Sequence, residues 1–177
     1  ALARARVQAS PPSRHQPLSR LRLRPPRDAG ALPGVRTARY FVAFVSPSEA
    51  RGTGFLGNYG VLTVTDGVVD LVDVGRNDEL NTAGEPVKII SGPPEYLARY
   101  SRFEPESTWE NVTFTPDGLT AGQVMAELYE QSGGTPVDGV IRIDPTGLAR
   151  LLRLTGPIVV DGLPYALDAT NVVSFLE

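Results

Sequence analysis

Residues 59–74, YGVLTVTDGVVDLVDV, predict a β-hairpin. Two apolar-rich runs, Tyr59–Thr65 and Val68–Val74, flank Asp66-Gly67, a dipeptide that favours the two-residue turn between antiparallel strands. In the second strand, apolar surface is expected from Val69, Leu71, Val72 and Val74, and Asp70 and Asp73 are expected to face outward.

Further strands are predicted on both sides of the hairpin. Residues 39–45 form a short aromatic and β-branched run, followed by turn-rich residues 46–57. Residues 137–143 and 158–160 are two more apolar runs with a helical pattern between them, which predicts a βαβ unit. A short strand is also considered at residues 111–114.

Helix signals separate these strands. Pro93-Pro94 favours the start of a short helix, and residues 120–131 form an amphipathic stretch that ends at Gly133-Gly134. Asp144 and Pro145 are typical of the start of a helix over residues 146–154, with Leu148, Leu151 and Leu152 expected to be buried. A last helix, capped by Asp168 or Thr170, would contain Val172, Val173 and Leu176. Residues 76–92 are expected to be mostly irregular.

The fold class is therefore α/β, with a mixed central sheet flanked by helices.

Charge divides the chain into two parts. Residues 1–39 contain nine arginines and one acidic residue, whereas residues 40–177 have a net charge of −11. We expect an Arg/Pro-rich leader or linker over residues 1–38 and an α/β domain over residues 39–177, truncated at its C-terminus. The leader is either an arm for anionic surfaces or a simple linker. The acidic domain argues against a nucleic-acid partner.

Composition excludes several kinds of chemistry. The chain has no cysteine, so disulfides, thiolate nucleophiles and cysteine-based metal sites are absent. His15, in the leader, is the single histidine. A Ser-His-Asp hydrolase or a histidine-ligated zinc site inside the domain is therefore excluded.

Two arginines are the strongest candidates for anion binding. Arg51 lies in a glycine-rich loop near Glu49, and Arg76 follows the hairpin near Asp78. A guanidinium group suits phosphate or carboxylate, although each arginine could equally form a local ion pair at the surface. The loop itself lacks the Gly-Lys-Ser/Thr sequence and the following helix of a phosphate-binding P-loop.

Acidic and aromatic side chains supply weaker candidates. Carboxylates near turns could hold a hard cation such as Mg²⁺ or could simply be solvated. They are Glu49, Asp73, Asp78 and Glu79. Trp109 is expected in the core or at its rim rather than as a platform for a sugar.

Three stretches resemble a known bacterial family. They are ARYFVAFVSPSEARGTGFLGNYGVLTVTDG, VDGVIRIDPTGLARLLRLTGPIVVDG and LDATNVVSFLE, and together they are similar to the family catalogued as domain of unknown function 4012 over about residues 38–177. This family carries no established activity. More remotely, the order of elements resembles the LytR-CpsA-Psr family. That resemblance implies a membrane-anchored enzyme outside the cytoplasm, which transfers a polyprenyl-pyrophosphate-linked glycopolymer to peptidoglycan with Mg²⁺ at the pyrophosphate.

The resemblance assigns roles to individual positions. The acid-x-Arg pair of the LytR-CpsA-Psr family falls on Glu49 and Arg51, and a second arginine falls on Arg76, with Asp78 one step late. Another family arginine is replaced by Leu56, and a metal-binding aspartate by Asn58. A neutral amide is a poorer Mg²⁺ ligand than a carboxylate, so the site would be degenerate.

These assignments lead to two functional hypotheses. In the first, a cell-envelope domain outside the cytoplasm, anchored through a segment not in this chain, binds a polyprenyl-(pyro)phosphate-linked glycopolymer, and transferase activity is left open. Arg51 and Arg76 would be the catalytic residues, Glu49, Asn58 and Asp78 would contact the ligand, and Glu49 and Asp78 would hold Mg²⁺. In the second, the domain is a non-catalytic scaffold or protein-interaction module. Convergence of the two arginines at the mouth of an apolar cavity favours the first hypothesis, and an exposed patch favours the second.

Overall fold

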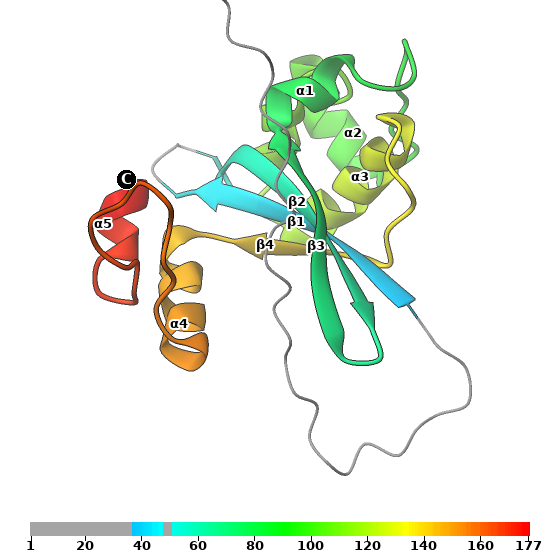
Figure 1. Cartoon of the computed structure of the whole chain (residues 1–177). Coiled ribbons are helices and arrows are strands. Elements are labelled where there is room, and N and C mark those ends of the chain that lie inside the picture. The colour runs from blue at the N-terminus through cyan, green and yellow to red at the C-terminus, as the bar shows by residue number, and fades with distance from the viewer. Residues whose placement is uncertain (1–36, 48–50) are drawn as a thin grey trace, which may run out of the picture.

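A four-stranded mixed sheet forms the centre of the protein (Figure 1). The computed structural model describes residues 37–47 and 51–177. The strands lie in the order β3-β2-β1-β4, with β1 at Thr37–Ser46, β2 at Phe55–Thr65, β3 at Val68–Arg76 and β4 at Gly139–Ile143. The first three strands pair antiparallel, and β4 pairs parallel with β1. The expected α/β class and mixed sheet are confirmed.

The predicted hairpin is present. Asp66 and Gly67 form its turn, with φ values of 50° and 77°, as expected for a turn whose twist matches that of the strands. Strand β2 begins at Phe55, so the glycine-rich segment before Tyr59 is partly strand rather than loop.

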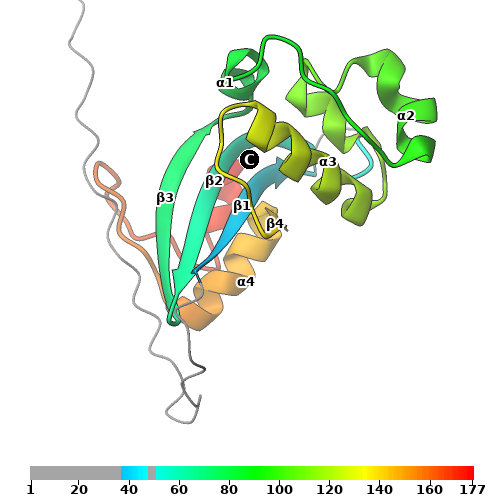
Figure 2. The same ribbon diagram turned by 90° about the vertical axis from the view of Figure 1, so that its right-hand side faces the viewer.

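Helices cover both faces of the sheet (Figure 2). The first face carries α1 (Asn77–Thr82), α2 (Pro94–Tyr100), α3 (Gly118–Gln131) and two 3₁₀ turns, η1 (Ser101–Phe103) and η2 (Trp109–Phe114). The second face carries α4 (Pro145–Thr155) and α5 (Val172–Leu176). Among the described residues, none of the helices has the length and hydrophobicity needed to cross a bilayer.

An aromatic cluster fills the core between the first face and its helices. The ring of Phe41, on β1, lies 5.5 Å from Tyr59, 5.6 Å from Trp109 and 5.1 Å from Tyr129, measured between ring centroids. All four side chains are buried. Aromatic pairs at these separations stabilise a core beyond the burial of their area. Trp109 therefore lies in the core, as expected.

Three expected elements differ from the structure. Residues 77–82 form α1 rather than an irregular segment, because Leu80 is buried and Asp78 and Glu79 lie in the first turn, where negative charge is favourable. Residues 111–114 belong to η2 and not to a strand, because the three-residue spacing of the buried Trp109 and Val112 suits a 3₁₀ turn.

The expected βαβ unit is the third difference. Residues 158–160 contribute a single isolated bridge, from Ile158 to Leu167, and no strand of the sheet. The parallel pair is instead β1 with β4. The sheet is therefore mixed because of a long-range pairing that a local pattern does not reveal.

A bulge in β3 decides which face of the sheet Asp73 borders. Val61 pairs with Asp73 and Leu62 pairs with Leu71, which leaves Val72 without a partner. Asp73 consequently lies on the first face, where its Oδ2 accepts long hydrogen bonds from the hydroxyls of Tyr59 (3.5 Å) and Tyr129 (3.3 Å). The Asp73 side chain is nevertheless exposed, as predicted, so it borders the first face without being buried in it.

The start of α4 matches its sequence signal. The Asp144 carboxylate accepts a 2.6 Å hydrogen bond from the backbone N–H of Gly147, and Pro145 occupies the first turn. Leu152 is buried as expected, but Leu151 is 45% exposed, so that part of the prediction is wrong. Leu151 lies outside the small apolar cluster in which Ala149 and Leu152 of α4 pack against Val172 of α5.

The position of Asp73 makes a testable prediction about tyrosine ionisation. Burial first, and the Asp73 carboxylate second, raises the pKa of Tyr59 from 10.0 to about 12 and that of Tyr129 to about 12. These tyrosines therefore contribute stability that is full below pH 10 and is lost as the pH rises towards 12. Asp73→Asn should lower both pKa values in a titration of tyrosinate absorbance. Asp70→Asn, on the same strand, is the control, and an equal effect of both variants would contradict the placement of Asp73.

Candidate functional site

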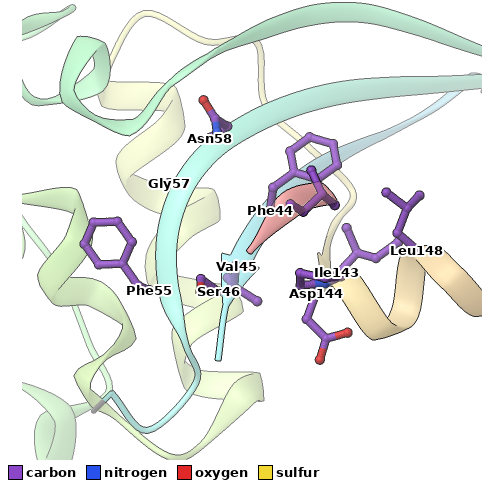
Figure 3. A pocket seen from close by; sticks show the side chains of 11 residues that line it. Phe44, Val45, Ser46, Phe55, Gly57, Asn58, Ile143, Asp144 and Leu148 are labelled. Atoms are coloured by element: carbon purple, nitrogen blue, oxygen red, sulfur yellow. The ribbon is translucent and has the colours of Figure 1, made fainter. Parts of the chain in front are cut away.

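A cavity of about 340 Å³ lies between the sheet and the α4–α5 layer (Figure 3). Its apolar walls come from Phe44 on β1, Ile143 at the end of β4, Leu148 on α4 and Leu176 on α5. Figure 3 shows Phe44, Ile143 and Leu148 grouped together, whereas the ring of Phe55, which also borders the cavity, is directed away from them. The volume falls in the lower range of small-molecule sites.

Strand pairing places the walls of this cavity. Phe44 pairs with Ile143 on one side and with Asn58 on the other, so the three side chains form a row on the second face. Strand β4 continues directly into α4, which brings Leu148 over the same row. Polar groups are also present, because Ser46, Asn58 and Asp144 border the cavity.

Arg76 extends the row beyond the cavity. It pairs with Asn58 across β2 and β3, and cross-strand neighbours share a face of the sheet. Its side chain is 70% exposed, and its Nε lies 3.2 Å from Oδ1 of Asp78. The structure thus brings together three sequence candidates, Asn58, Arg76 and Asp78, at one end of the apolar cavity.

Arg51 is engaged elsewhere. One of its terminal nitrogens donates hydrogen bonds to the Glu110 carbonyl (2.6 Å) and to Oδ1 of Asn111 (2.9 Å). Its guanidinium lies 4.3 Å from the ring centroid of Phe114 and 5.5 Å from that of Phe55. These contacts tie the start of β2 to η2. Neither Arg51 nor Arg76 lines the cavity, so the two arginines do not converge at it, and the observation expected to favour the first functional hypothesis is absent.

The described residues show no cluster of three carboxylate or imidazole ligands for a metal ion. Within residues 37–47 and 51–177, no group of three acidic or histidine side chains gathers around one point. Asp78 already pairs with Arg76, and Asn58 is neutral. Glu49, the other expected ligand, lies outside the described residues. The expectation of bound Mg²⁺ stays a prediction.

The apolar walls of the cavity were not singled out by the sequence. Phe44 and Ile143 belong to correctly predicted strands, but their common face depends on the parallel pairing of β1 with β4. Leu148 and Leu176 come from separate helices, both expected to be apolar on one side. The alternation of side chains along β1 is the sequence signal that could have identified Phe44. Side chains of a strand alternate between its two faces, so Phe44 lies on the face opposite to the buried Phe41, Ala43 and Val45.

The different surroundings of the two arginines predict different effects of their removal. Arg51→Ala should lower the free energy of unfolding by about 1.5–3 kcal/mol, because it removes charge-assisted hydrogen bonds from a partly buried group. Arg76→Ala should change it by less than about 0.5 kcal/mol, since the exposed ion pair with Asp78 contributes little. Equilibrium unfolding in urea measures both. Equal losses would show that Arg51 does not stabilise the fold through these contacts.

Comparison with known proteins gives one match. A family model described as "Protein of unknown function (DUF4012)" matches residues 36–177, which is most of the chain. No curated protein and no solved structure matches the chain. The match supports the first of the two resemblances seen in the sequence and does not extend to the LytR-CpsA-Psr family. From its β1 strand to its last helix, this chain belongs to the DUF4012 family.

Proposed function

We propose that this domain binds a polyprenyl-(pyro)phosphate-linked glycopolymer in the cell envelope, outside the cytoplasm. Part of the polyprenyl chain would occupy the cavity lined by Phe44, Ile143 and Leu148, and the phosphate would lie beside Asn58 and Arg76. One observation supports the proposal. A row of cross-strand neighbours leads from Phe44, in the apolar wall of the cavity, to the amide of Asn58 and the guanidinium group of Arg76.

The two halves of such a ligand need different surroundings. A polyprenyl chain gains free energy by leaving water, at about 25 cal/mol per Å² of apolar surface. The cavity of about 340 Å³ has room for the part of the chain nearest the phosphate, and the rest would stay in the membrane. The phosphate remains near solvent, where Arg76 is 70% exposed and free to turn from Asp78 towards an anion.

Binding without turnover is the form of this proposal that the geometry favours. A phosphoglycosyl transferase needs several positive groups around the pyrophosphate, because charge builds up there in the transition state. Arg51 is held by Glu110 and Asn111, and the described residues gather no group of three side chains that could ligate a metal ion. We therefore assign Arg76 and Asn58 to ligand binding and derive no transfer step.

A second candidate function is a scaffold that binds another protein. The engagement of Arg51 within the fold favours it, as do exposed apolar residues on the second face, such as Leu71 and Ile141. The two candidates differ in one respect. A scaffold does not require a ligand in the cavity, whereas the first proposal does.

Binding of a short soluble analogue, farnesyl phosphate, tests the cavity. It should raise the melting temperature of the full chain. Arg76→Gln should weaken its affinity by about tenfold, because a charge-assisted contact is lost. Gly57→Leu should weaken it as well, because Gly57 borders the cavity and a Cβ atom there would meet no atom within 4 Å, leaving room for a side chain that competes with the ligand. Arg99→Gln, an exposed arginine on α2, is the matched control.

Two further probes separate the parts of the ligand. Farnesol lacks the phosphate and should bind more weakly than farnesyl phosphate, and Arg76→Gln should leave the affinity for farnesol unchanged. Inorganic phosphate alone should give little stabilisation, since the apolar contribution is missing. The proposal fails if farnesyl phosphate produces no shift in the melting temperature, or if Arg76→Gln and Arg99→Gln behave alike.

A further inference from the structure

The α4 region lacks acidic residues in an otherwise acidic domain. Residues 145–160 contain Arg150 and Arg153 and no carboxylate, whereas residues 40–177 carry nineteen acidic residues and a net charge of −11. Both arginines are exposed. The outer side of α4 is therefore positively charged, although the domain over residues 40–177 has a net negative charge.

The same region exposes unusually large apolar side chains. Leu154, near the end of α4, is 86% exposed, and Val159, just after it, is 83% exposed. Leu151 and Tyr165 are about half exposed. Figure 2 shows the segment between α4 and α5 projecting away from the sheet. The segment turns at Gly162, where φ is 89°.

Helical geometry places the two arginines and the exposed leucines of α4 on the same side of the helix. Residues three and four apart share a side of a helix, so Leu148 and Leu152 direct one side of α4 towards the protein. Arg150, Leu151, Arg153 and Leu154 occupy the opposite side. A helix face that combines arginine and leucine without any acidic residue is typical of helices that lie in a membrane interface.

We propose that the outer side of α4, together with the segment 156–167, binds the surface of an anionic lipid bilayer. Leu154 and Val159 would enter the boundary between headgroups and acyl chains. Arg150 and Arg153 would contact lipid phosphates, and Tyr165 would lie at headgroup level, as tyrosine does at membrane interfaces. Asp161, beside the Gly162 turn, would remain in the aqueous headgroup layer.

Charge favours a bilayer over a second copy of the chain. In a symmetric dimer through this surface, the two arginines of each copy would face those of the other. An anionic bilayer instead complements them. The acidic residues of the α1–α3 layer lie on the other face of the sheet, and repulsion from exposed charges farther than about 8 Å is largely screened at physiological salt. This surface does not depend on a ligand in the cavity, although Leu148 of α4 contributes to both.

The absence of cysteine allows a site-specific test in the full chain. Val159→Cys is labelled with a polarity-sensitive fluorophore and mixed with phosphatidylcholine vesicles, with or without phosphatidylglycerol. The emission should shift to the blue with anionic vesicles. Val87→Cys, 75% exposed in the segment between α1 and α2, is the matched control and should not shift. The leader arginines can bring the chain to the vesicle, but the label reports only whether residue 159 enters it.

Arginine variants in the labelled chain complete the test. Arg150→Gln combined with Arg153→Gln should raise the lipid concentration needed for half of the shift by at least about tenfold. Arg99→Gln combined with Arg102→Gln should leave it unchanged. No shift at residue 159, an equal shift at residue 87, or no effect of Arg150→Gln with Arg153→Gln would overturn the proposal. A blue shift on concentrating the protein without vesicles would overturn it in favour of a second copy.

Discussion

The stacking of aromatic rings on Phe41 is the contact on which the rest of the structure depends. Phe41 lies on β1, the strand that pairs with both β2 and β4, and its ring contacts Tyr59, Trp109 and Tyr129. These partners come from β2, η2 and α3, so one side chain connects three separate segments. The rings fill the core on this face, and the cavity lined by Phe44 lies on the opposite face.

The sequence predicted the elements whose signals are local. The Asp66-Gly67 turn, the Asp144-Pro145 helix start and the apolar side of α3 each lie within a few residues, and all three are present. The pairing of β1 with β4 joins residues about a hundred positions apart, and no short pattern encodes it. Residues 158–160 are equally apolar in sequence, but they form only an isolated bridge, from Ile158 to Leu167, and do not join the sheet.

The candidate site was predictable in part. Asn58, Arg76 and Asp78 were identified by resemblance, and they lie close together because β2 and β3 pair in a hairpin. Arg51 is equally basic in sequence, but its surroundings are set by Glu110, Asn111 and Phe114, about sixty residues away. A sequence pattern identifies a guanidinium group. Whether that group faces a ligand or the protein itself depends on tertiary contacts.

The parallel strand β4 also determines when the cavity can form. Between Ser46 and Gly139 the chain makes the hairpin and the helical layer of the first face, and β4 can join β1 only after this long loop has closed. Such distant pairings slow folding. Three residues that line the cavity, Ile143, Leu148 and Leu176, belong to β4 or come after it in the sequence. We therefore expect the cavity to form late in folding, and a fluctuation that detaches β4 would open it and also remove Val140 from the edge of the aromatic core.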